Sequence, residues 1–123
     1  MRRSVLITML FLLISMNPSF AMGENRKKFD IIKEKFKMVD LSDGVNKEEA
    51  SIIAQNHLVN KNFQAKDINI FRPRVEQSGL FNNFWVVIFN PSFHIRISQG
   101  LEWYSLNIDK QTGEIKTEGW GPS

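Results

Sequence analysis

The sequence predicts an α+β fold: an antiparallel sheet of three to five strands packed on one main helix, with an extra short N-terminal helix. Three observations lead to this prediction. Residues 101–116 alternate between apolar and polar side chains around a turn signal. Residues 46–58 place small and apolar residues at helical spacing behind a capping signal. Residues 84–89 are all apolar, as in the central strand of a sheet.

The first 21 residues have the order of a secretory signal peptide. Arg2 and Arg3 precede an uncharged apolar run at residues 5–16, and the small residues Ser19 and Ala21 stand at positions −3 and −1 of a cleavage site. The run is shorter than the roughly 20 residues that span a bilayer. We therefore expect an exported protein, periplasmic or secreted, without a stable membrane anchor after cleavage. An uncleaved anchor helix is the alternative.

The composition of the chain after residue 21 excludes several classes of function. Removing Arg2 and Arg3 from the 16 basic residues leaves 14, against 13 acidic residues, so the formal charge is about +1. We expect no nucleic-acid partner, because such proteins concentrate basic residues on one face. The chain has no cysteine. Disulfides, thiol catalysis, a lipoprotein anchor and cysteine-ligated zinc are therefore excluded.

Residues 22–45 are predicted to form a polar lead-in and a short amphipathic helix. Residues 22–28 are mostly polar, and Phe29, Ile32 and Phe36 follow at helical spacing among several lysines. The basic face is either solvated or in contact with an acidic partner or anionic lipid. Residues 41–44 end the helix.

Residues 46–120 are predicted to form the main domain, which begins with its main helix. Asn46 is a good N-cap, and Glu49 occupies the capping-box position. The apolar stripe that follows, with small residues that allow close approach to a sheet, consists of Ala50, Ile53, Ala54, His57 and Leu58. Residues 60–62 end the helix.

The middle of the chain changes to strand patterns. Ile68 and Ile70 alternate with polar or exposed positions and predict a strand that Pro73 ends. Residues 77–79 indicate a turn. Residues 84–89 predict a central strand covered on both faces, which Asn90 and Pro91 end.

Residues 92–99 have a clear period of two, with Phe93, Ile95 and Ile97 between polar residues. Two interpretations are open, a further strand of the sheet and a protruding finger.

The last predicted element is a hairpin within residues 101–116. Tyr104, Leu106 and Ile108 face one side of its first strand. Asp109 can accept hydrogen bonds from the following backbone, and Gly113 can take the positive φ that closes the turn. Residues 118–122 are expected to be a short tail.

Three motifs together resemble the PepSY domain. They are Asn46-Lys47-Glu48-Glu49-Ala50-x-x-x-Ala54, Phe84-Trp85-Val86-Val87 and Tyr104-x-Leu106-x-Ile108-Asp109-x-x-Thr112-Gly113-Glu114-Ile115. The resemblance covers about residues 46–118. It implies a cystatin-like α+β sheet wrapped on one helix, and a role outside the cytoplasm that often consists of controlling peptidases.

The sequence departs from the PepSY pattern in two places, residues 92–99 and the additional N-terminal helix. Small NTF2-like bacterial immunity proteins have a similar order of helix and strands and a similar ending. Neither resemblance implies catalytic residues.

No arrangement of reactive residues predicts an enzyme. His57 lies on an apolar stripe, where a core-edge histidine is the simpler interpretation, and with His94 it does not have the spacing of metal ligands. Asp109 is explained by its turn. No phosphate-binding loop or nucleophile elbow is present. We therefore expect no catalytic residues, no cofactor and no metal site.

Binding to another protein is the better supported function. Trp103 falls on the strand face opposite Tyr104, among polar residues, and is either a contact anchor or packed under the N-terminal helix. Phe93, His94 and Arg96 form the second candidate surface.

The leading hypothesis is therefore an exported PepSY-like protein that binds, and plausibly restrains, a peptidase. The alternatives are an immunity protein against an envelope-targeted toxin and a small-ligand carrier with a cavity lined by Trp103 and its neighbours. The sequence specifies no oligomeric state.

Overall fold

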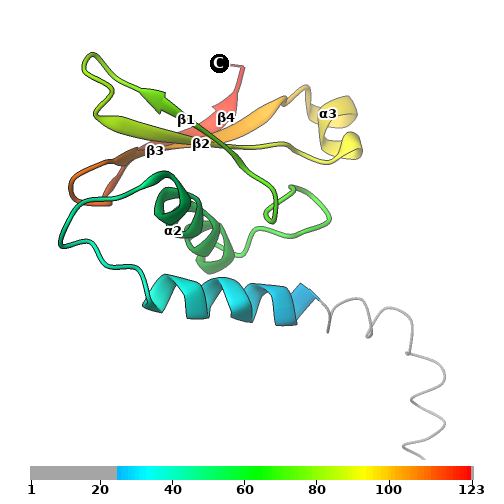
Figure 1. Cartoon of the computed structure of the whole chain (residues 1–123). Helices are drawn as coiled ribbons and strands as arrows, with labels where there is room; N and C mark the ends of the chain where they lie inside the picture. Colours follow the sequence, from blue (N-terminus) through cyan, green and yellow to red (C-terminus); the bar gives the residue numbers. More distant parts are fainter. Residues whose placement is uncertain (1–24, 123) are drawn as a thin grey trace, which may run out of the picture. The chain divides into compact units, whose positions relative to one another are not determined.

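A computed structural model of the chain describes residues 25–122. It contains three helices and one four-stranded antiparallel sheet, which confirms the predicted α+β class. The helices are residues 25–37, Lys47–Asn60 (α2) and Phe93–Gln99 (α3), and the strands are Arg74–Ser78 (β1), Phe84–Phe89 (β2), Trp103–Asp109 (β3) and Ile115–Gly121 (β4) (Figure 1).

The chain divides into two compact units, Met1–Ile31 and Ile32–Ser123. Of the first unit, the structure describes residues 25–31, which are helical. Residues 25–28 already belong to the helix, so the lead-in predicted for residues 22–28 is wrong for these four residues. The predicted signal peptide lies outside the described residues. Within residues 25–122, no helix combines the length and the apolar character needed to cross a membrane.

Helix α2 begins with the predicted capping box. The Asn46 side chain accepts from the Glu49 backbone N–H at 2.8 Å, and the Glu49 carboxylate accepts from the Asn46 N–H at 2.9 Å. Together they satisfy two of the four backbone donors that a helix N-terminus leaves unpaired. Just before the cap, Val45 donates its N–H to Lys110 O and accepts from Trp85 Nε1, which ties the start of α2 to the sheet.

The predicted stripe of α2 is the buried side of the helix. Ala50, Ala54 and Leu58 are completely buried, and Ile53 is nearly so, whereas His57 at the end of the stripe stays partly exposed. Figure 1 shows α2 running beside one face of the sheet. Whether the sheet wraps α2 in the manner of a PepSY domain stays a prediction.

The sheet has the order β1-β2-β3-β4, and each strand is antiparallel to the next. The predicted hairpin is confirmed as β3 and β4. Asp109 Oδ1 accepts from the backbone N–H groups of Gln111 and Thr112, and Gly113 takes a φ of +78°. The residues expected to form a tail, 118–122, instead continue β4 as far as Gly121.

The two faces of the sheet differ in burial. Val87, Phe89, Leu106 and Ile108 are buried on the inner face, as the alternation in the sequence predicts. Strand β2 is interior, as expected, but Phe84, Val86 and Ile88 on its other face are only half-buried. The expectation that this strand is covered on both faces is therefore fulfilled on one face only.

The strand predicted at Ile68 and Ile70 is wrong. Both side chains are fully buried, but Ile68 makes a single bridge to Pro91 and Ile70 donates its N–H to Ile68 O in a tight turn. The alternation in the sequence reflects that the side chains of Ile68 and Ile70 both point into the core, although this segment pairs with no strand of the sheet. The first strand, β1, follows Pro73 and includes Gln77 and Ser78, so the turn predicted for residues 77–79 begins only at Gly79. As an edge strand with one apolar residue, β1 carries almost no hydrophobic pattern.

Residues 92–99 do not form the predicted strand, because Phe93–Gln99 is helix α3. The segment protrudes between β2 and β3 at one end of the sheet, as a short helix (Figure 1). Its preceding residue, Ser92, is extended at the N-cap, and Gly100 adopts the left-handed conformation at the C-terminus. Strands β2 and β3 pair directly with each other, so the segment between them has no place in the sheet. The period of two in its sequence did not reflect a buried face, since α3 has no buried residue.

Candidate functional site

Among the apolar residues of the described helices and strands, the most exposed lie on α3. Phe93 is 77% exposed and Ile97 is 69% exposed, and their spacing of four residues places them on the same side of the helix. We call Phe93, His94, Arg96 and Ile97 the α3 surface; all four are exposed. It includes three of the four predicted contact residues. Ile97 was not predicted as a contact residue, because residues four apart are close neighbours in a helix but not along a strand.

His94 connects α3 to the turn at residues 65–67. Its Nδ1 lies 2.9 Å from Ser92 Oγ, and its Nε2 lies 3.1 Å from Asp67 Oδ1. The backbone adds a bond from Ser92 N–H to Asp67 O at 2.8 Å. Serine, histidine and aspartate in this order also form hydrolytic triads. Here Ser92 is the N-cap residue of α3 and the three bonds close the junction before it, so we assign them a positioning role.

Trp103, the fourth predicted contact residue, is the first residue of β3. Strand β3 begins at the end of the sheet where α3 lies (Figure 1). It is 38% exposed and lies on the outer face, opposite Tyr104. Its indole ring lies over Gly121 of β4, since a Cβ at Gly121 would be 2.2 Å from Trp103 Nε1. Its neighbour across the sheet is thus a glycine, which leaves space for the ring.

A second apolar spot lies in the loop between β1 and β2. Leu80 is 88% exposed and Phe81 is 83% exposed. Gly79 and Asn82 on either side have positive φ, which identifies a tight loop. The sequence contains a signal for this loop, because Gly79 and two asparagines, which favour turns, flank the two apolar residues.

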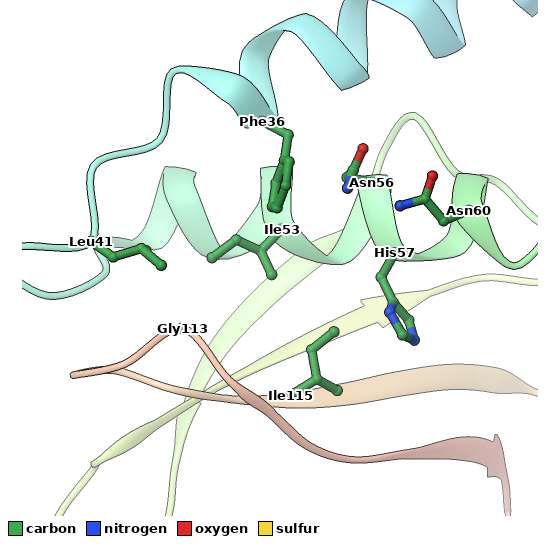
Figure 2. A pocket seen from close by; sticks show the side chains of 8 residues that line it. All are labelled: Phe36, Leu41, Ile53, Asn56, His57, Asn60, Gly113 and Ile115. Carbon is green, nitrogen blue, oxygen red and sulfur yellow. The ribbon is translucent and has the colours of Figure 1, made fainter.

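A cavity of about 300 Å³ opens beside α2 (Figure 2). Its apolar wall includes Phe36 and Ile53, and its polar wall comes from one side of α2. The lining residues are Phe36, Leu41, Ile53, Asn56, His57, Asn60, Gly113 and Ile115. Sequence analysis did not predict this cavity, since it joins residues from three separate segments of the chain.

Glu118 of β4 is the centre of a polar network at the edge of this cavity. Its Oε2 lies 2.7 Å from His57 Nε2, and its Oε1 accepts from Lys61 Nζ at 3.1 Å and from the Tyr104 hydroxyl. The network joins α2, β3 and β4. His57 is thus a core-edge histidine with a partner, as expected, whereas Glu118 was missed because it was assigned to a tail.

The network shifts the pKa values of two of its members. Burial alone would raise the pKa of Glu118, but hydrogen bonds from Tyr104, Lys61 and His57 outweigh that effect and lower it below the ordinary value. Burial, together with the hydrogen bond and the charge of Glu118, raises the pKa of the Tyr104 hydroxyl. Glu118 is therefore ionised and Tyr104 protonated at neutral pH.

Within residues 25–122, no group of three or more histidine or acidic side chains is placed to hold a metal ion. Comparisons of the chain with models of protein families, with curated proteins and with solved structures find no match.

Proposed function

We propose that this chain is an exported, non-enzymatic module that binds another protein through the α3 surface. One observation carries the proposal. Helix α3 has three apolar residues among seven, yet it buries none of them and leaves Phe93 and Ile97 largely in water. Exposed apolar side chains gathered on one helix face are typical of binding surfaces. Trp103, partly exposed at the adjoining strand end, extends the candidate contact.

We further propose a PepSY-like packing of the sheet on α2. It is supported by the burial of Ala50 and Ala54, whose small side chains allow close approach, and by the hairpin turn built on Asp109 and Gly113. On this proposal, the partner is a peptidase that the module restrains. Helix α3 lies in the segment that departs from the PepSY pattern, so it is the place for recognition of a particular partner.

An immunity protein against a toxin delivered to the envelope is the second candidate. It is favoured by the same α3 surface, since both functions need one strong protein contact. The small-ligand carrier expected a cavity lined by Trp103, and the cavity of Figure 2 is lined by other residues. We therefore do not carry that function forward in its original form.

Export is part of the proposal and has its own test. We expect the chain isolated from the envelope fraction of its own cells to begin at Met22. Intact-mass measurement and N-terminal sequencing would show this directly. A chain that retains residues 1–21 would support the uncleaved anchor and contradict the mature form proposed here.

The binding function is tested with paired charge substitutions. The immobilised chain from Met22 onward is exposed to envelope extract, and the captured proteins are compared with those captured by Phe93→Asp/Ile97→Asp. We expect the double substitution to remove the captured partner. The matched control, Leu80→Asp/Phe81→Asp, places the same two charges on the other exposed apolar spot and should retain it.

The identity of the partner separates the two candidate functions. A captured peptidase whose activity falls in stoichiometric proportion to added module supports the first, and a captured toxin that is neutralised supports the second. If the Leu80/Phe81 variant loses the partner while the Phe93/Ile97 variant keeps it, the α3 surface is not the contact.

A further inference from the structure

The cavity beside α2 contains a buried polar side chain without a partner. Asn56 is 7% exposed, and within residues 25–122 no hydrogen bond joins its side-chain amide to another group. Its amide carries two donors and one acceptor oxygen. Buried polar groups are almost always hydrogen-bonded, so one without a partner needs an explanation. Asn56 lines the cavity, where a bound molecule could pair with it.

The second polar group of the cavity is His57. Glu118 is ionised and lies 2.7 Å from His57 Nε2, so Nε2 carries a ring proton and donates it to that carboxylate. In the imidazole with a single ring proton, Nδ1 keeps its lone pair, and none of the hydrogen bonds found in the described part of the chain uses it. That tautomer offers His57 Nδ1 as an acceptor to a donor group of the ligand, while Asn56 and Asn60 offer both donors and acceptors.

The rest of the cavity is apolar and open. Phe36 is 40% exposed and Leu41 is 43% exposed, although both line it, and Ile53 and Ile115 complete the apolar wall (Figure 2). Gly113 allows Leu41 to approach the hairpin turn, since a Cβ there would be 3.1 Å from Leu41 Cδ2. A volume of about 300 Å³ is at the lower end of small-ligand sites.

Charge further restricts the occupant. None of the eight lining residues is an acid, a lysine or an arginine, and His57 is the one ionisable group among them. Glu118 and Lys61, at the edge of the cavity, already pair with each other. A charged ligand would lose its hydration without gaining a charged partner among the residues that line the cavity. The cavity therefore favours an uncharged polar group attached to an apolar body.

We propose that this cavity binds one large apolar residue of an extended peptide segment from another polypeptide, together with the peptide amide of that residue. The apolar side chain of the bound peptide packs against the wall formed by Phe36, Leu41, Ile53 and Ile115. The peptide N–H donates to His57 Nδ1, and a peptide carbonyl accepts from the amide of Asn56, with Asn60 at the rim. The site is distinct from the α3 surface, and its test needs no knowledge of the partner proposed above.

The test is a titration of the ¹⁵N-labelled chain, from Met22 onward, with N-acetyl-L-leucinamide followed by amide chemical shifts. We expect saturating shifts at residues 53–60 and 113–115. N-acetylglycinamide, which lacks the apolar side chain, and N-acetyl-L-leucine, which is charged, should each bind at least tenfold more weakly. An amidated, acetylated pentapeptide with a central leucine should bind more tightly than the single residue.

Two variants connect the binding to the proposed residues. Asn56→Leu should raise the melting temperature, because it removes an unpaired buried amide, and weaken pentapeptide binding about tenfold. Leu41→Ser, at the exposed rim, should weaken binding several-fold even if Asn56→Leu fails to fold. Asn69→Ala, an exposed asparagine outside the cavity, should leave binding unchanged.

Three results would overturn the inference. They are shifts outside the cavity or none at all, equal binding of the charged N-acetyl-L-leucine, and pentapeptide affinity that is unchanged in both Asn56→Leu and Leu41→Ser. Because these measurements use peptides alone, they can fail while capture of a partner by the α3 surface succeeds, and the reverse.

Discussion

Glu118 connects three elements of the fold. Its carboxylate is hydrogen-bonded to His57 of α2, to Lys61 directly after α2 and to Tyr104 of β3, while its own backbone belongs to β4. Its side chain is 23% exposed, so these contacts are partly shielded from water. Removing one acceptor therefore affects three donors, one of which, Tyr104, is buried and needs its partner.

Glu118→Gln should destabilise the fold by about 1–2 kcal/mol at neutral pH, because it removes the charge from these hydrogen bonds. The folded-state pKa of Glu118 is lowered, so the stabilisation is present above its unfolded pKa and is lost as the pH falls through the folded pKa. Melting temperatures of the two proteins should consequently differ at pH 7 and converge as the pH falls below the ordinary glutamate pKa and through the lowered folded-state pKa of Glu118. A constant difference at all pH values would contradict this role.

Trp103 and Gly121 provide a second test at the scale of single residues. Gly121→Ala would place a methyl group 2.2 Å from Trp103 Nε1, so the indole ring must move outward. We expect a red shift of tryptophan emission and a lower melting temperature. Gly119→Ala is the control on the same strand, since a Cβ there has no atom within 4 Å. Equal effects of both substitutions would show that the ring does not depend on this glycine.

Single-residue roles were predictable from sequence where the partner is local. Asn46 with Glu49, and Asp109 with the backbone of the next residues, act within one turn. Glu118 pairs with His57, which lies 61 positions earlier in the sequence, and this pairing depends on the register of β4. No local pattern contains this information.

At the scale of elements, α2 depends on its first turn. Asn46→Ala removes the acceptor of the Glu49 N–H and should cost about 1 kcal/mol of unfolding free energy. Chemical denaturation measures this loss directly. Lys47→Ala, at the neighbouring exposed position, should change the stability by a few tenths of a kcal/mol at most. A loss as large in the control would mean that the cap is not the cause.

The errors at the scale of elements have a common physical origin. A period of two predicts a strand at residues 68–70 and leaves a strand as one of two interpretations at residues 92–99, although neither segment has a strand partner. Alternation specifies a strand only when an adjacent strand can complete its hydrogen bonds. The real edge strand, β1, has one apolar residue in five and was nearly invisible.

At the scale of the whole molecule, the fold class followed from three local signals: the capping box, the apolar run at 84–89 and the hairpin. The candidate sites did not follow from them to the same degree. Phe93, His94 and Arg96 were predicted as a loop or edge that pairs with a partner strand, so their position on a helix together with Ile97 was not predicted. The cavity could not be predicted from the sequence, because it forms only where Phe36, α2 and the hairpin turn come together in the folded chain.

Two of the exposed apolar spots of the second unit lie at opposite ends of the sheet, and Met38, at 83% exposure, is a further exposed apolar residue outside both. The α3 surface and Trp103 lie toward one end of the sheet, and Leu80 and Phe81 follow β1 at the other end. This separation is useful, because the two spots act as controls for each other in any binding experiment. It also means that a single partner of ordinary size is expected to cover one of them and leave the other in water.

The most direct test of the proposed function is hydrogen–deuterium exchange of the chain, free and in complex with its captured partner. Binding through α3 predicts slower exchange for residues 93–103 in the complex, with exchange in the loop at residues 79–83 unchanged. Slower exchange at residues 79–83, with residues 93–103 exchanging as in the free chain, would contradict the α3 surface as the contact.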